Sequence, residues 1–148
     1  MVLATSNPQH SFETARTLED LTVSQTLLNF TNLEYIIPHA GGAWPSSLDR
    51  LISAYPAIHA ASLAVFTGPR FWWDSAGPTY AHQVEGLLAY GVSPSQLLFG
   101  TDFPYAPSYT QAGSLAGVRA SPWVTAAQKT ALFTANAMTL LGKAFPRP

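Results

Sequence analysis

Three apolar stretches of this sequence each end in a side chain that could bind a metal ion or move a proton. His39 follows "EYIIP", Asp74 and Ser75 follow "RFWW", and Asp102 follows "LLFGT". A carboxylate can bind a divalent cation or take up a proton, and an imidazole can do both near neutral pH. Each residue alone also fits an ordinary structural role, as a satisfied polar group, a helix cap or a turn residue.

Small and aromatic residues accompany these three positions. Gly41 and Gly42 follow His39 directly, where glycine permits a sharp turn or the close approach of a ligand, although a plain turn explains them as well. Gly100, which has no side chain, lies in the third stretch two residues before Asp102. Several aromatic residues near the three stretches could stack on a flat ligand, although core packing is the commoner use of such residues. They are Trp44, Trp72, Trp73, Phe103 and Tyr105.

Alternating elements are expected to position these residues. We expect helices at 13–30, 46–66 with a break at Pro56, 79–91 and 125–142, and strands at 33–38, 70–75 and 97–102. Ser11 or Thr14 would cap the first helix, and Ser46 or Ser47 the second. Helices alternating with nearly continuous apolar strands are typical of an α/β fold with a parallel sheet. The carboxyl ends of such strands lie on one edge, which carries the site in α/β proteins.

The composition argues against several classes of function. The 148 residues are 47% hydrophobic and only 10% charged, against a usual charged share of roughly 25%. Much of the surface is therefore expected to be covered by other structure. A net charge of −1 without a basic run argues against nucleic-acid binding. No cysteine is present, which excludes thiolate metal sites. With no signal peptide or membrane-spanning stretch in view, we expect a cytoplasmic chain.

The segments "PHAGGAWP", "WWDSAG" and "LLFGTDFPYAP" together resemble the amidohydrolase-related metal-dependent decarboxylases. Within that family the segments look like those of the 6-methylsalicylate decarboxylase group, which is related to aminocarboxymuconate-semialdehyde decarboxylase. The resemblance implies a (β/α)₈ barrel, one divalent metal (zinc, with manganese as the alternative) and a small aromatic carboxylic acid as substrate. It makes Asp102 a metal ligand, His39 a catalytic residue that handles protons with Asp102, and Asp74 and Ser75 part of the site lining. Gly41, Gly42 and Phe103 are further lining candidates.

The resemblance also has gaps. The family carries a His-x-His or Glu-x-His pair on its first strand and a metal histidine on its fifth, and this sequence offers neither. His10 does not match a ligand position, and His59 and His82 fall in expected helices. A full barrel takes about 250 residues. We therefore expect residues 1–148 to form a single partial barrel domain with about strands six to eight, which lacks ligands that a missing N-terminal half or a homo-oligomer would supply.

Three functions remain open from the sequence. The first is a metal-dependent decarboxylase that protonates the ring carbon bearing the carboxylate before CO₂ leaves. The second is a hydrolase on the same fold that attacks an ester or amide with metal hydroxide. The third is a non-catalytic fragment, and the missing ligands indicate that the chain alone is inactive.

Overall fold

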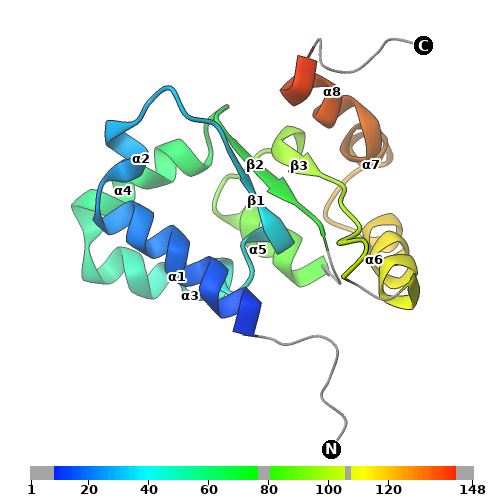
Figure 1. Cartoon of the computed structure of the whole chain (residues 1–148), viewed down its shortest axis with the longest axis horizontal. Coiled ribbons are helices and arrows are strands. Elements are labelled where there is room, and N and C mark those ends of the chain that lie inside the picture. Colours follow the sequence, from blue (N-terminus) through cyan, green and yellow to red (C-terminus); the bar gives the residue numbers. More distant parts are fainter. Residues whose placement is uncertain (1–8, 77–80, 106–107, 143–148) are drawn as a thin grey trace, which may run out of the picture.

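The computed structural model describes residues 9–76, 81–105 and 108–142, and its centre is a parallel sheet (Figure 1). The three strands are β1 (Tyr35–Ile37), β2 (Phe71–Asp74) and β3 (Leu97–Leu98), in the order β1-β2-β3. Ile37 pairs with Trp73 across the first strand pair, and Asp74 pairs with Leu98 across the second. The α/β class and the parallel arrangement expected from the sequence are thus confirmed.

Helices connect the strands, as a parallel sheet requires. The helices α1 (Gln9–Val23) and α2 (Thr26–Asn29) precede β1. The turn η1 (Pro38–Gly41) and the helices α3 (Trp44–Ala54) and α4 (Pro56–Phe66) lead to β2. The helix α5 (Ala81–Ala89) and the 3₁₀ turn η2 (Pro94–Gln96) lead to β3. After β3 come the helix α6 (Ser108–Ala120), the helix α7 (Ala126–Thr130), the π-helical turn η3 (Ala131–Ala135) and the helix α8 (Asn136–Leu141).

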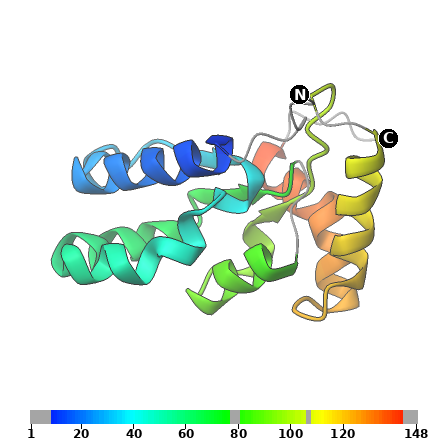
Figure 2. The ribbon, with the colours of Figure 1, turned by 90° about the horizontal axis from the view of Figure 1, so that it is seen from below.

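The helices gather on two sides of the sheet. Figures 1 and 2 both show α1–α4 beside β1 and α6–α8 beside β3. In the part of the chain that the structure describes, no helix is both long enough and apolar enough to cross a membrane.

An aromatic cluster on one face of β2 forms the centre of the core. Phe71 and Trp73 alternate with Trp72, so their side chains share a face, and both are buried. Trp44 of α3 packs on Trp73 with 5.3 Å between ring centroids, and Phe66 of α4 packs on Phe71 at 4.9 Å. The alternation places Asp74 on the opposite face of β2, away from this cluster.

Polar side chains fix the amino ends of the strands. The Nε2 atom of Gln96 donates to the backbone carbonyl oxygens of Phe66, Gly68 and Phe71 at 3.0, 2.9 and 2.8 Å. The guanidinium of Arg70 donates to three carbonyl oxygens near the end of α2, those of Leu27, Phe30 and Leu33. Arg70 and Gln96 directly precede β2 and β3, so these bonds tie the amino ends of the two strands to the ends of α2 and α4.

Several sequence expectations are confirmed and others are wrong. The helical break at Pro56 is confirmed, because a Pro ring cannot continue the hydrogen-bonding pattern of α3. Neither Ser46 nor Ser47 caps α3: the N-cap is Ala43, whose carbonyl oxygen accepts bonds from both hydroxyls. Ser11 and Thr14 lie inside α1 rather than at its start.

Two elements also differ in extent from those expected. The 13–30 helix is divided at Gln25, which adopts a left-handed φ of 59°. The strand expected at 97–102 ends at Leu98, and α6 occupies part of a segment for which no element was expected. Residues 79 and 80 at the start of the expected 79–91 helix lie outside the described residues.

Candidate active site at the carboxyl ends of the strands

His39 follows β1 within η1, where the backbone turns sharply. Its φ of 55° and ψ of 35° are left-handed, a conformation that is uncommon for residues other than glycine. Its ring Nδ1 lies 2.7 Å from the backbone carbonyl oxygen of Ala76, just beyond β2. A carbonyl oxygen can only accept, so Nδ1 carries the hydrogen in this bond. Nε2 is then the ring nitrogen that can exchange a proton or bind a cation.

Asp74 is the last residue of β2 and is half-buried. Its carboxylate Oδ1 accepts the backbone N–H of Ala76, an i to i+2 contact of the Asx-turn type. Burial raises the pKa of the Asp74 carboxyl above its ordinary value, and the negative charge of Asp102 raises it further. The Ala76 N–H and the charge of His39 act in the opposite direction. The charges of His39 and Asp102 thus both act on the Asp74 carboxyl.

The Asp74 carboxylate lies directly against Gly100. A Cβ at Gly100 would overlap the carboxylate oxygens of Asp74, so only glycine leaves room for this arrangement. Neighbouring Ser75 is buried, and its Oγ accepts the Gly100 N–H at 3.3 Å while its own N–H donates to the Leu98 carbonyl at 2.9 Å. These contacts join the end of β2 to the segment that leads to Asp102.

Asp102 lies in the turn after β3, half-buried and with a left-handed φ of 59°. Its carbonyl oxygen accepts the Tyr105 N–H at 2.8 Å, which closes the turn. Phe103 and Tyr105 are 77% and 84% exposed, so these two rings are available to a ligand or to further structure. The other three aromatic candidates, Trp44, Trp72 and Trp73, are buried, and Trp44 and Trp73 belong to the core cluster.

The glycine pair after His39 lies against other parts of the chain. A Cβ at Gly42 would overlap the backbone of Ser11 in α1, and the next residue, Ala43, donates its N–H to the Ser11 carbonyl at 3.0 Å. A Cβ at Gly41 would come within 3.0 Å of the Trp73 ring. Both glycines therefore have a packing role, and their contact with a substrate stays a prediction.

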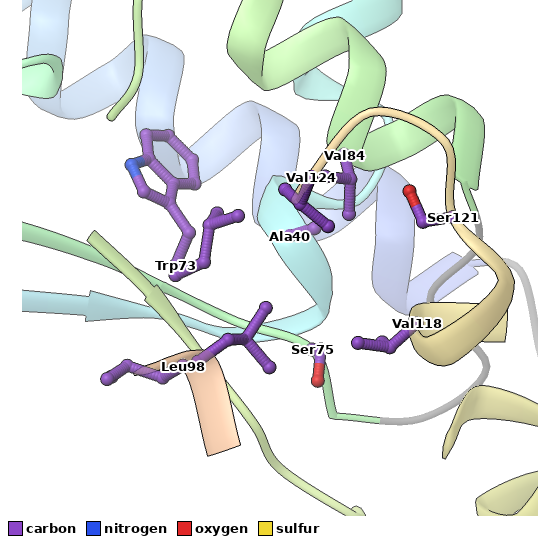
Figure 3. Close-up of a pocket in the computed structure, with 10 residues that line it drawn as sticks. Ala40, Trp73, Ser75, Val84, Leu98, Val118, Ser121 and Val124 are labelled. Carbon is purple, nitrogen blue, oxygen red and sulfur yellow. The ribbon is translucent and has the colours of Figure 1, made fainter. Parts of the chain in front are cut away.

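Two hollows adjoin these residues. A groove of about 460 Å³ runs between α1 and β1 and is lined by His39 together with Ile36 and Leu18, among others. This volume lies in the range of small-molecule sites, roughly 300–1,000 Å³. A second cavity of about 20 Å³ lies beside Ser75 among Val84, Val118 and neighbouring side chains (Figure 3). It is too small for an aromatic acid, so Ser75 faces packed structure there.

The described residues do not make a metal site by themselves. Among them no group of three or more His, Asp or Glu side chains is placed to hold a metal ion. Protein zinc sites use at least three protein ligands. Asp102 can offer one carboxylate and His39 one ring nitrogen, which leaves the set short.

The other histidines take no part in this cluster. His59 is buried in α4, and its Nε2 lies 3.2 Å from the Glu19 carboxylate of α1, so it serves packing between the two helices. His82 is exposed on α5. His10 lines the groove between α1 and β1 at its α1 side.

Two contacts at this edge were not predicted. The backbone carbonyl of Ala76 holds His39, and Gly100 leaves space for Asp74. The Asx turn at Asp74 could have been expected from an aspartate directly after a strand, but a main-chain partner for His39 leaves no mark in the residue types.

Comparison with known proteins agrees with this arrangement. Residues 7–143 match the model of the amidohydrolase family. The chain belongs to this family. The resemblance noted in its three strand-end segments is thereby confirmed at the family level.

Individual amidohydrolase relatives are similar in sequence or fold. The 6-methylsalicylic acid decarboxylase of Penicillium expansum is 29% identical over 100 residues, which is 64% of this chain and 31% of that protein. A solved amidohydrolase II is 25% identical with a TM-score of 0.78, over 90% of this chain and 43% of that one. A Polaromonas dihydroxybenzoic acid decarboxylase, with bound manganese and an inhibitor, is 19% identical with a TM-score of 0.69, over 92% and 42%. The chain therefore spans less than half the length of these relatives.

Proposed function

We propose that this chain is the C-terminal part, about strands six to eight, of a metal-dependent carboxy-lyase barrel. Its substrate would be a small aromatic carboxylic acid such as 6-methylsalicylate. The observation that carries the proposal is the meeting of His39, Asp74 and Asp102 at the carboxyl ends of three neighbouring parallel strands. Family membership and the decarboxylases among its relatives support the same reaction.

The reaction needs one proton in and one CO₂ out. A proton is added to the ring carbon that bears the carboxylate, which interrupts the aromatic system. The bond between that carbon and the carboxylate then breaks, its electron pair returns to the ring, and CO₂ leaves. A group that supplies the proton must lie beside the ring carbon and titrate near neutral pH.

His39 is suited to this proton transfer. With Nδ1–H held by the Ala76 carbonyl, the imidazole has a fixed orientation and a single nitrogen, Nε2, for exchange with the substrate. Asp102 is half-buried in the neighbouring turn and would share in proton handling or bind the metal. The exposed ring of Phe103 could stack on a flat acid, with Gly41, Gly42, Asp74 and Ser75 as the remaining candidates for the site lining.

A divalent metal would supply charge stabilisation and orient the carboxylate of the substrate. Asp102 would be one of its ligands, and zinc or manganese would fit a carboxylate and imidazole site. A related decarboxylase holds manganese. Because the described residues lack a full set of ligands, the remaining ones would come from another polypeptide segment or a second copy.

The β1 side of the sheet offers a place for that additional structure. Within the described residues β1 pairs only with β2, and Ile36 on β1 is 51% exposed. An open strand edge with exposed apolar side chains favours pairing with a further strand. The groove between α1 and β1 lies on the same side and reaches His39.

Elemental analysis of the purified 148-residue chain is the first test. We expect far less than one zinc or manganese per chain, and no release of CO₂ from 6-methylsalicylate. One tightly bound metal per chain, with decarboxylation, would contradict the partial-barrel proposal. Hydrolysis of an ester or amide without CO₂ release would support the hydrolase alternative.

A chimaera is the second test. The part of the Penicillium expansum 6-methylsalicylic acid decarboxylase that precedes the matched region would be fused ahead of this chain. We expect the fusion to bind metal and release CO₂, and His39→Asn in the same fusion to lose at least about 100-fold in kcat, the range of general acid–base catalysis. A fusion that folds and binds metal but releases no CO₂ would refute the carboxy-lyase proposal.

A further inference from the structure

The backbone N–H and carbonyl group of Ala76 make polar contacts with two candidate site residues. Its N–H donates to the Asp74 carboxylate, and its carbonyl oxygen accepts the Nδ1–H of His39 at 2.7 Å. Asp74 belongs to β2 and His39 to the turn after β1, so this short backbone segment connects the ends of the two strands. A change at Asp74 can therefore reach the imidazole through the main chain.

The carboxylate of Asp74 is itself confined. Gly100 lies so close that any Cβ there would overlap both carboxylate oxygens. Ser75, between Asp74 and Ala76, is held by its N–H to the Leu98 carbonyl and by its Oγ to the Gly100 N–H. The turn after β2 is thus fixed on the β3 side by the backbone N–H and the hydroxyl of Ser75, and Asp74 fixes it internally.

We propose that Asp74 is a positioning residue, which orders the Ala76 backbone so that its carbonyl fixes the His39 imidazole with a hydrogen on Nδ1 and Nε2 free for proton exchange. The inference deepens the proposed function, on which it rests for the chemical role of His39. It assigns Asp74 a different role from that of a lining residue in contact with the substrate.

Two features favour this role over a direct one. The Asp74 carboxylate is engaged by its own main chain and packed against Gly100, whereas a group that binds substrate needs an open approach. His39 also lies in a sharp left-handed turn, and its ring is bonded through Nδ1 to the Ala76 carbonyl at 2.7 Å. A side-chain contact such as that with Ala76 is then the means of fixing its orientation and tautomer.

NMR of the ring nitrogens of histidine tests the proposal without metal or substrate. The 148-residue chain, labelled with ¹⁵N-histidine, would be studied at about pH 8.5, two units above the ordinary imidazole pKa of about 6.5. His39→Asn identifies the His39 signals. We expect one Nδ1–H tautomer for His39 in the unmodified chain, with well-separated signals for its two nitrogens.

Three variants then separate the possible causes. Asp74→Ala removes the acceptor for the Ala76 N–H, and we expect the His39 signals to collapse toward the average of two tautomers. Asp74→Asn keeps an acceptor oxygen in an Asx turn, so we expect it to retain the Nδ1–H pattern. Gly100→Ala leaves Asp74 in the sequence but displaces its carboxylate, and we expect the same loss as with Asp74→Ala.

Two controls accompany these variants. The buried His59, paired with Glu19 in the helical layer, is an internal reference whose signals stay unchanged in every folded variant. Asp20→Ala removes an exposed carboxylate from α1, and we expect it to leave the His39 signals as they are. If the His59 signals also shift in Asp74→Ala because that variant has unfolded, Gly100→Ala and Asp74→Asn decide the question.

The outcomes are distinct. A His39 tautomer that survives both Asp74→Ala and Gly100→Ala would overturn the proposal. An Asp74→Asn variant that behaves like Asp74→Ala would overturn it too, because the charge rather than the hydrogen bond would then orient the ring. A chimaera without decarboxylase activity would refute the proposed function and leave this NMR result standing.

Discussion

Polar residues at the two ends of the central sheet differ in burial, in hydrogen bonding and in backbone conformation. At the amino end, Gln96 and Asn136 are buried, and each donates to two or more backbone carbonyls at distances between 2.8 and 3.0 Å. At the carboxyl end, His39, Asp74 and Asp102 are half-buried, and the first and last adopt left-handed backbone conformations. Satisfied groups with ordinary geometry thus occupy one end, and strained backbone with partly exposed polar groups the other.

The difference indicates which end is built for stability and which for chemistry. A left-handed residue other than glycine costs on the order of 1–3 kcal/mol, and such costs concentrate at functional sites. In barrels of the family's kind, the carboxyl ends of the strands carry the reaction and the amino ends maintain the fold. Replacements at the amino end should therefore lower the free energy of unfolding strongly. Some replacements at the carboxyl end should lower it only a little, or even raise it.

Gln96→Leu should give the largest effect. It removes the donor that the carbonyl groups of Phe66, Gly68 and Phe71 share. The Gly68 carbonyl keeps the Phe71 N–H at 3.2 Å, and each buried carbonyl left unsatisfied costs roughly 1–3 kcal/mol. We expect the free energy of unfolding to fall by about 3–6 kcal/mol, measured by urea denaturation followed by circular dichroism. A loss below about 1 kcal/mol would remove the distinction between the two ends.

Gly42→Ala comes second and tests the scaffold beneath His39. Its φ of 60° and ψ of −122° suit glycine alone, and the added methyl would overlap the Ser11 backbone. We expect a loss of roughly 2–3 kcal/mol from strain and the displaced helix. Gly113→Ala is the matched control: its methyl would meet nothing within 4 Å inside α6, and it should gain up to about 1 kcal/mol. Equal effects of the two variants would show that α1 is not tightly packed on this turn.

Asp74→Asn should give the smallest effect, with a sign that depends on pH. Because burial raises the pKa of Asp74 in the folded chain, the folded state holds a proton that the unfolded state releases above about its ordinary pKa of 3.8. The contribution of Asp74 to the stability of the unmodified chain should therefore fall as pH rises from 3.8 through the raised value. Asparagine does not titrate, so the variant should gain relative to the unmodified chain between pH 3 and pH 7.

Urea denaturation of both proteins at pH 3 and pH 7 would measure this gain. A difference that stays constant, or that grows toward acid pH, would contradict the burial of the Asp74 charge. It would also weaken the contrast between a stabilising and a costly end of the sheet.

Much of the fold could be predicted because local signals agree with the tertiary structure. The apolar runs at 33–38 and 70–75 contain β1 and β2, and Pro56 divides two helices as its ring requires. The helix α6 could not be predicted with the same rules, because Gly113 and Gly117 lower helix propensity in its interior. Its buried face, which includes Ser114 and Val118 four residues apart, is decided by packing against the rest of the chain.

The candidate site could be predicted only in part. The apolar strands lead directly to His39, Asp74 and Asp102, so a common edge follows from parallel pairing. Two features of the site depend on distances between segments that are far apart in sequence. The bond that holds the His39 ring joins residues about 37 apart, His39 and Ala76. The overlap that excludes a side chain at Gly100 involves Asp74, about 26 residues earlier. Residue types do not encode such distances. The packing of Gly42 on α1 and of Gly41 on Trp73 could likewise not be predicted from the sequence, and their contact with a substrate stays a prediction.

The main-chain contacts at Ala76 have a consequence for how this protein could vary. Every amino acid except proline carries the N–H that Asp74 accepts, and every one carries the carbonyl that holds His39. The side chain at position 76 therefore takes part in neither bond. Substitution scanning would pass over the residue that joins the two strand ends, and only a change in the backbone itself, such as proline or an ester linkage, would reveal it.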